Sequence, residues 1–231
     1  FRTLAQVEYH LNNGGLRLTF PTLGTSLKYP WTAEQAGANG KFSCFRSEHR
    51  FLQELANRLG LIQQPDGRLA RHPLSYLMEA ADDICYALID LEDAVELSII
   101  EFVEVEEIFL DIQGTKVLDL NNSGNISPGR QLSALRSKTI GCIVDAVVAT
   151  YVTHLDSIMA ATFTGDLISA CPERIRNGIN RAKNLAINKV FMDVQKTETE
   201  IGAYTVLSVL LKTFIEAGFE FHQKRDRKAL S

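Results

Sequence analysis

The sequence lacks the features that mark a cysteine-zinc, secreted or membrane protein. Its four cysteines are scattered and form no CxxC pair, which argues against a cysteine-based zinc site. Cys85, Cys142 and Cys171 lie in apolar or helical surroundings, so we expect small core residues in a reducing compartment. No apolar run approaches the roughly 18 residues of a transmembrane helix, and no signal peptide is recognised. We therefore expect a cytoplasmic protein without membrane contact.

An excess of basic charge is also missing. The formal net charge is −4 and the sequence pI is about 5.8, so the whole chain gives no electrostatic support for nucleic acid as a partner. The one basic cluster, at residues 224–228, is predicted to be a solvated helix end rather than a binding patch. The 231 residues are enough to bury a substantial core.

Helical periodicity dominates the chain, and strand-like alternation is nearly absent. The pattern therefore predicts an all-α fold. Residues 101–118 fit a helix or a strand, and we favour a helix, while Asn121–Gly129 is the clearest break. Helices are predicted at residues 1–11, 16–29 (broken near Pro21), 47–60, 74–99, 131–154, 172–191 and 197–219.

The helix predicted at residues 74–99 carries the most informative pattern. Asp82, Tyr86 and Asp90 recur at every fourth position, which places them in a row down one side of the helix. Carboxylates beside an apolar stripe face the edge of a core or a cleft, where they need cations or a metal ion. The predicted core face comprises Leu74, Leu77, Met78, Ala81, Ile84, Cys85, Leu88, Leu91 and Val95.

The spacing of these acids leaves two interpretations open. One is a ligand site, in which a metal-binding carboxylate, an aromatic surface and a second carboxylate follow one another along the helix. The other is an ordinary acidic, solvated face of an amphipathic helix. Spacing alone favours the second interpretation.

Longer motifs resemble a known family. The stretch His72–Tyr86, HPLSYLMEAADDICY, followed by IDLED at residues 89–93, is similar to the signature of bacterial dGTPase-like triphosphohydrolases. FRTL at 1–4, NGGLRLT at 13–19, LKYP at 27–30, LRSK at 135–138 and EIGAY at 200–204 also fit. The similarity spans nearly the whole chain. It implies a single all-helical domain over residues 1–231, the C-terminal portion of a longer HD-superfamily protein with an HD-domain-like multi-helix bundle.

The resemblance also implies roles for individual residues. Asp82 corresponds to the last ligand of a divalent metal, Mg²⁺ or Mn²⁺, whereas Asp83 points about 100° away. Tyr86 corresponds to a tyrosine that packs against the deoxyribose, and Asp90 to an aspartate that receives the 3′-hydroxyl. Lys28 resembles a lysine that contacts the triphosphate, with a solvated helix-end lysine as the alternative.

One part of the family pattern is absent. None of the five histidines is followed by aspartate, so the H…HD metal ligands are missing. The histidine and glutamate that relatives use for catalysis are missing as well. We therefore expect no catalytic residue in this chain and no activity of the 231-residue polypeptide alone. His72, before a proline at a helix start, is expected to be structural.

These observations predict part of an enzyme that hydrolyses a deoxynucleoside triphosphate to the deoxynucleoside and inorganic triphosphate. The resemblance further implies a homo-oligomer. The alternative is a non-catalytic helical scaffold or nucleotide-sensing module derived from the same family. An HD-type phosphohydrolase acting on nucleoside monophosphates fits the scaffold but not the row Asp82, Tyr86 and Asp90.

Overall fold

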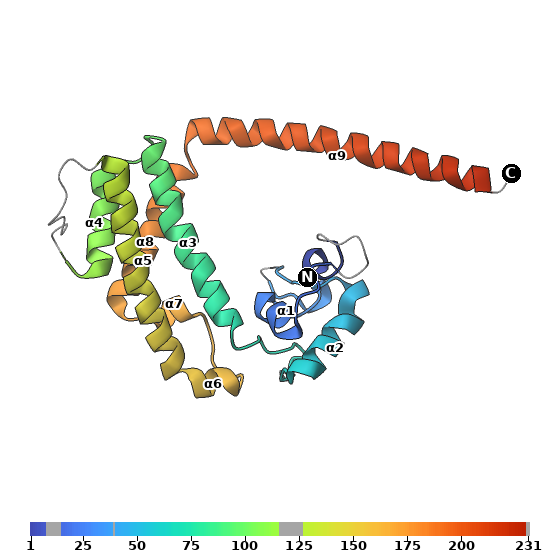
Figure 1. The fold of residues 1–231 in the computed structure, drawn as a ribbon, viewed down its shortest axis with the longest axis horizontal. Coiled ribbons are helices and arrows are strands. Elements are labelled where there is room, and N and C mark those ends of the chain that lie inside the picture. The colour runs from blue at the N-terminus through green and yellow to red at the C-terminus, as the bar shows by residue number, and fades with distance from the viewer. Residues whose placement is uncertain (8–14, 39, 116–126, 230–231) are drawn as a thin grey trace.

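The computed structural model describes residues 1–7, 15–38, 40–115 and 127–229, and these residues form helices and connecting loops without a strand (Figure 1). The all-α prediction is therefore confirmed. The helices are α1 (Phe20–Ser26), α2 (His49–Leu59), α3 (Ser75–Glu96), α4 (Phe102–Gln113), α5 (Pro128–Thr153), α6 (Leu155–Met159), α7 (Leu167–Ala170), α8 (Glu173–Leu185) and α9 (Val194–Ala229). Short π-helical turns at Thr3–Val7 and Ala186–Val190 and 3₁₀ turns at Ala33–Gln35 and Arg46–Glu48 complete them.

Helices α3, α4, α5, α7 and α8 pack around the larger hydrophobic cluster, which we call the bundle core. The ambiguous segment forms helix α4 and ends at Gly114 in the left-handed conformation, so the helix prediction is confirmed within the described residues. Helices α4 and α8 approach closely at Gly178, where a Cβ atom would lie 2.2 Å from the side chain of Ile112. Glycine at this position therefore sets the distance between the two helices.

Residues 1–7, 15–38 and 40–70, which we call the N-terminal unit, surround a smaller hydrophobic cluster that includes Leu27, Leu52 and Leu55. Pro21 lies in the first turn of α1, where its missing N–H and fixed φ are tolerated, so it begins the helix and does not break it. The predicted start of α2 at Ser47 is two residues early, because a 3₁₀ turn precedes the helix. Gly60 adopts the left-handed conformation and ends α2.

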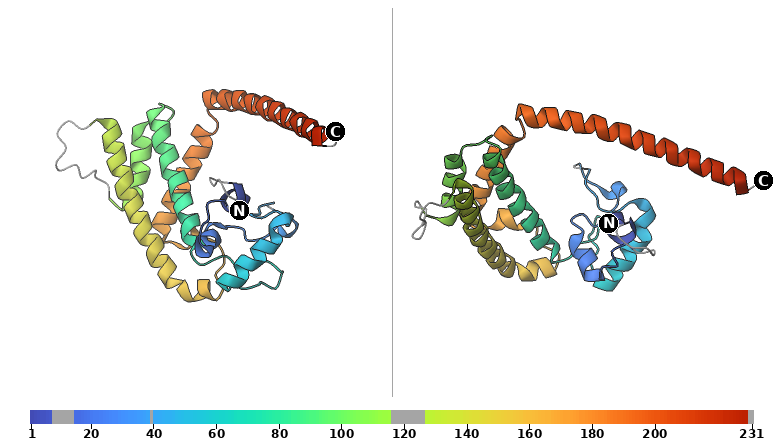
Figure 2. Two further views of the ribbon diagram at one scale, coloured as in Figure 1. Left: turned by 45° about the vertical axis from the view of Figure 1, so that its right-hand side comes forward. Right: turned by 45° about the horizontal axis from the view of Figure 1, so that its top comes forward.

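The two clusters are joined where α1 meets the start of α3. Ser75 is fully buried, and its Oγ lies 2.9 Å from the carbonyl oxygen of Thr25 and 3.2 Å from those of Gly24 and Leu27. The buried Ser75 hydroxyl donates its one hydrogen among these carbonyls and so holds the end of α1 on α3. Figure 2 shows the N-terminal unit beside the lower end of α3 in both views.

Helix α9 leaves the bundle near the C-terminal end of α3 and runs as a long arm past the N-terminal unit (Figures 1 and 2). It is longer than the predicted helix at residues 197–219. Residues Thr197–Lys224 are long and apolar enough to cross a membrane by length and composition alone, and none of this segment is buried. One such helix is weak evidence, because the core helix of a soluble protein passes the same test.

The predicted core face of α3 is correct in its centre and wrong at several positions. Ile84, Leu88 and Leu91 are buried, whereas Leu74, Ala81 and Cys85 are exposed. The error has a physical reason, since the bundle covers only one side of α3 and these three residues lie on its open side. Among the cysteines, Cys44 and Cys171 are the buried ones.

Candidate functional site

The exposed side of α3 carries the residues that the sequence singled out. Asp82 is exposed, Tyr86 is 48% exposed and Asp90 is partly buried. Because four residues advance a helix by about 6 Å, the row from Asp82 to Asp90 is about 12 Å long. The structure therefore brings these three side chains to one solvent-accessible face.

Asp83 faces in a different direction from its neighbour. Its carboxylate accepts a hydrogen bond from Lys183 Nζ of α8 at 2.9 Å and so belongs to the contact between α3 and α8. The adjacent Asp82 is left on the open face. Consecutive positions on a helix diverge by about 100°, which explains why the two aspartates have different surroundings.

Lys28 lies at the N-terminal end of the same helix although it is far away in the sequence. It follows α1 directly, and the contacts of Ser75 with the end of α1 hold this segment against α3. Lys28 Nζ is 3.0 Å from Glu79 Oε1, one turn before Asp82. The structure thus brings Lys28 and the α3 row together.

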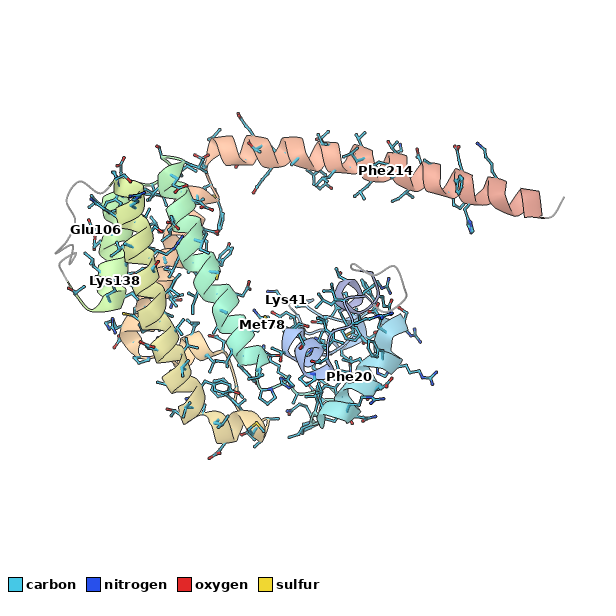
Figure 3. The ribbon with its side chains drawn as sticks, viewed as in Figure 1. Phe20, Lys41, Met78, Glu106, Lys138 and Phe214 are labelled. Carbon is cyan, nitrogen blue, oxygen red and sulfur yellow. The ribbon has the colours of Figure 1, made fainter. Side chains whose placement is uncertain are left out.

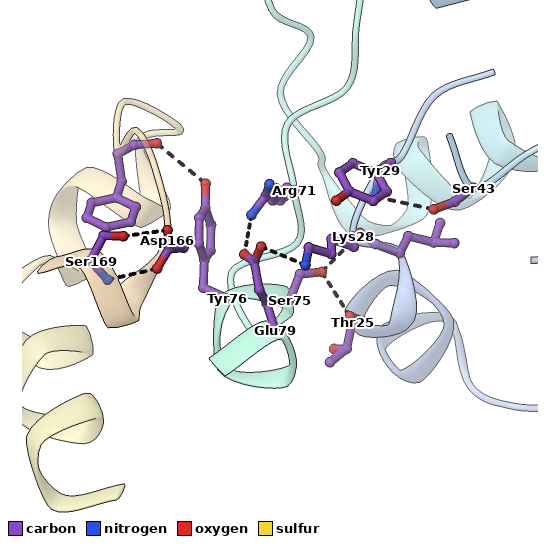
Figure 4. Close-up of polar contacts among 12 residues, drawn as sticks. Thr25, Lys28, Tyr29, Ser43, Arg71, Ser75, Tyr76, Glu79, Asp166 and Ser169 are labelled. Atoms are coloured by element: carbon purple, nitrogen blue, oxygen red, sulfur yellow. Dashed lines mark hydrogen bonds and ion pairs between the residues drawn. The ribbon is translucent and has the colours of Figure 1, made fainter. Parts of the chain in front are cut away.

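Glu79 is a site residue that the sequence analysis missed. It is buried, and its second oxygen is 2.5 Å from Arg71 Nη1, so two cations share one carboxylate (Figure 4). Burial lowers the pKa of Lys28, but the hydrogen bond and charge of Glu79 outweigh it and hold that pKa above its ordinary value. The only sequence signal was an acid immediately before Ala80–Ala81. It did not stand out, because several other acids lie in the same motif.

The Lys28, Glu79 and Arg71 cluster has one positive charge in excess. Both cations remain partly exposed, with 29% of the Lys28 side chain and 20% of the Arg71 side chain accessible. Arg71 also stacks over the ring of Tyr76 at 5.2 Å and borders a cavity of about 400 Å³ with Trp31 and Phe163. This end of α3 is therefore suited to an anionic group.

The middle of the row is aromatic. The ring of Tyr86 lies 5.8 Å from that of Phe191, with the two planes tilted by 34°. Phe191 follows the π-helical turn after α8 and precedes α9. Sequence periodicity gave no indication of this pair, because the two residues are brought together only by the packing of the turn after α8 against α3.

The described residues do not by themselves fit a metal ion. Within residues 1–7, 15–38, 40–115 and 127–229, no group of three or more His, Cys, Asp or Glu side chains is placed to hold one. Asp82 supplies a single carboxylate, whereas Mg²⁺ and Mn²⁺ need several oxygen or nitrogen ligands.

His72 lies at the junction between α1 and α3. Its Nδ1 is 3.2 Å from Thr25 Oγ1 and accepts a hydrogen bond from the backbone N–H of Leu74 at 3.3 Å. Burial lowers the pKa of His72 below its ordinary value. These contacts agree with the structural role expected from the sequence.

Taken together, Lys28 and Arg71 place two cations at the N-terminal end of α3. Asp82 and the pair of Tyr86 and Phe191 follow in the middle, and Asp90 lies about three turns after Glu79. An elongated ligand with an anionic end, a ring and a terminal hydroxyl group would match that order of side chains.

Comparisons with known proteins find relatives over nearly the whole chain. No family model matches the chain. A deoxyguanosinetriphosphate triphosphohydrolase-like protein of Pseudomonas aeruginosa is 44% identical over 226 residues, which cover 95% of this chain and 51% of the relative. A protein of the same name from Synechocystis is 30% identical, with 100% of this chain and 53% of the relative covered. A deoxyguanosinetriphosphate triphosphohydrolase of Enterobacter is 28% identical over 222 residues.

The chain belongs to the deoxyguanosinetriphosphate triphosphohydrolase-like family. It spans about half the length of the curated relatives it matches.

Proposed function

We propose that this chain forms part of a metal-dependent deoxynucleoside triphosphate triphosphohydrolase. The reaction is hydrolysis of a dNTP, such as dGTP, to the deoxynucleoside and inorganic triphosphate. The observation that carries the proposal is the order of side chains along α3, beginning with Lys28 at Glu79 and ending at Asp90. The names of the relatives support the same reaction.

In this proposal each residue has a role that its position supports. Lys28, held by Glu79, contacts the triphosphate, and Asp82 is one ligand of a divalent ion, Mg²⁺ or Mn²⁺. Tyr86 packs against the deoxyribose, and Asp90 accepts a hydrogen bond from the 3′-hydroxyl group. The remaining metal ligands and the catalytic groups come from outside this chain.

The proposal extends to the organisation of the longer protein. The contacts of Ser75 with the end of α1 join the two hydrophobic clusters and support a single domain over residues 1–231. The whole enzyme is a cytoplasmic homo-oligomer. It acts on a nucleotide, and the mildly acidic charge of the chain gives no support for nucleic acid as a partner.

The test uses the longer protein of which this chain forms part. It is incubated with Mn²⁺ or Mg²⁺ and each of the four dNTPs, and inorganic triphosphate is measured. We expect release of triphosphate by the parent and background release by the Asp82→Ala variant and by the 231-residue chain.

Asp145→Ala is the matched control, because Asp145 is an exposed aspartate on α5. It is expected to retain the parental rate. Undiminished release by Asp82→Ala would contradict the assignment of Asp82. No release by the parent with any dNTP would favour a scaffold or nucleotide-sensing module instead.

A further inference from the structure

Helix α9 is exposed along its described length. It contains 36 residues, so it is about 54 Å long. Figure 3 shows its side chains, Phe214 among them, standing clear of the other helices. The exposed large apolar residues of its central part are Ile201, Tyr204, Val206, Leu207, Val209, Leu210, Leu211, Phe214, Ile215, Phe219 and Phe221.

The apolar residues of α9 are not spread evenly. At 100° per residue, Thr205, Lys212, Glu216 and Gln223 fall on one narrow stripe. Lys212 and Glu216 approach each other along this stripe, with Nζ and Oε1 4.0 Å apart. Most large apolar side chains occupy the opposite half of the circumference. Helix α9 therefore has one polar edge and one broad apolar face.

The breadth of the apolar face limits what can cover it. A two-helix coiled coil with a second copy would bury a seam of two positions in seven and leave most of this face exposed. A membrane spanned by Thr197–Lys224 would surround the helix and bury Lys212 and Glu216 near the middle of that segment, which is costly. A face covering half of the circumference is typical of a helix packed into a protein core against more than one element.

The lengths of the relatives indicate where that core comes from. The match covers 95% of this chain but only 51% of the Pseudomonas aeruginosa relative, and 53% of the Synechocystis relative. About half of the family's polypeptide thus lies outside the matched region. We propose that α9 is a core helix of the longer protein and that its apolar face packs against the part of the family fold that this chain does not include.

The surroundings of α9 also support packing against the part of the family fold that this chain does not include. The helix begins three residues after Phe191, whose ring contacts Tyr86 on the open side of α3. Tyr86, Ile89 and Met192 are exposed large apolar residues next to this junction. A segment that covers α9 would therefore also reach the open side of α3. The packing does not depend on the reaction proposed above.

The experiment measures binding in the absence of metal and nucleotide. The 231-residue chain is co-expressed with the tagged part of the Pseudomonas aeruginosa relative that lies outside the match. We expect a one-to-one complex in which the backbone amides of residues 201–221 gain protection from hydrogen exchange. Leu210→Asp combined with Phe214→Asp places two charges on the apolar face and is expected to weaken the complex by about 100-fold or more.

Thr205→Asp combined with Gln223→Asp places the same two charges on the polar stripe and is expected to leave the affinity unchanged. Circular dichroism of the uncomplexed variants checks that the bundle remains folded. No complex, or equal affinity of both double variants, overturns the proposal.

Two further results also overturn it. One is self-association of the chain alone that Leu210→Asp and Phe214→Asp abolish, which would identify a second copy as the occupant. The other is protection of residues 201–221 by phosphatidylcholine–phosphatidylglycerol vesicles without the added segment, which would identify a membrane. Because no catalysis is measured, failure of this proposal and failure of the proposed reaction are distinguishable.

Discussion

Helices α3 and α9 are both long, both rich in apolar residues and both marked by acids, yet their surroundings are opposite. Leu88 on α3 is fully buried, whereas Leu211 on α9 is 61% exposed. The bundle and the N-terminal unit cover α3 on one side and leave its polar row accessible. None of the candidate membrane segment of α9, Thr197–Lys224, is buried.

The difference shows that the same residue types support different inferences when they are buried and when they are exposed. On α3 the apolar residues that face the bundle core are buried, and the proposed ligand site uses the carboxylates on its open side. On α9 the large apolar side chains are exposed, so the informative feature is an apolar face that no other described element covers. Measurements on matched residues of the two helices test this contrast.

The largest contrast is expected for leucine. Leu88→Ala removes a fully buried side chain from the bundle core and is expected to lower the free energy of unfolding by about 2–5 kcal/mol. Leu211→Ala is expected to change it by less than about 0.5 kcal/mol in this chain. Urea unfolding followed by circular dichroism measures both. Similar losses for the two variants would mean that α9 packs onto the bundle in solution.

A smaller contrast is expected for glutamate. Glu79→Ala leaves Lys28 and Arg71 without their shared carboxylate and is expected to cost about 1–3 kcal/mol, since both cations can still reach solvent. Glu220→Ala removes an exposed partner of Lys224 and is expected to cost less than about 0.5 kcal/mol. The same unfolding measurement compares them. Equal effects would remove the structural reason for assigning Glu79 to the site.

Much of the fold was predictable because helical periodicity depends on the sequence alone. The end of α2 follows from Gly60, which adopts a left-handed conformation that other residues avoid. The predicted segment 101–118 ran past Gly114, which ends α4 in the same conformation. The exposed positions of α3 were not predictable. Residues such as Cys85 look like core residues until the arrangement of the neighbouring helices is known.

The candidate site divides in the same way. The row Asp82, Tyr86 and Asp90 is visible as a four-residue spacing within one helix. The pairing of Glu79 with Lys28 and Arg71 joins three separate segments, and only the tertiary structure brings them together. Residues 8–14, which include the end of the predicted helix at residues 1–11, and residues 116–126, with part of the predicted break, lie outside the described residues.

The smallest effect is expected in the pH dependence of stability. The comparison is between His72, at the junction of α1 and α3, and His222 on α9. Because the pKa of His72 is lowered in the folded chain, the unfolded chain binds its proton more tightly. The contribution of His72 is therefore complete above the ordinary histidine pKa of about 6.5 and is lost as the pH falls below it. His72→Gln keeps an acceptor for the Leu74 N–H but cannot titrate, so it is expected to flatten the decline in stability between about pH 7 and pH 5.

His222→Gln is the matched control, because it removes a histidine from the exposed α9 helix. Urea midpoints at several pH values, compared among the chain and the two variants, give the result. If both variants change the slope equally, the junction does not depend on neutral His72, and the Thr25 contact does not link α1 to α3 in a pH-dependent way. A change confined to His72→Gln would tie the position of Lys28, which follows α1, to the protonation of a residue 44 positions later in the chain.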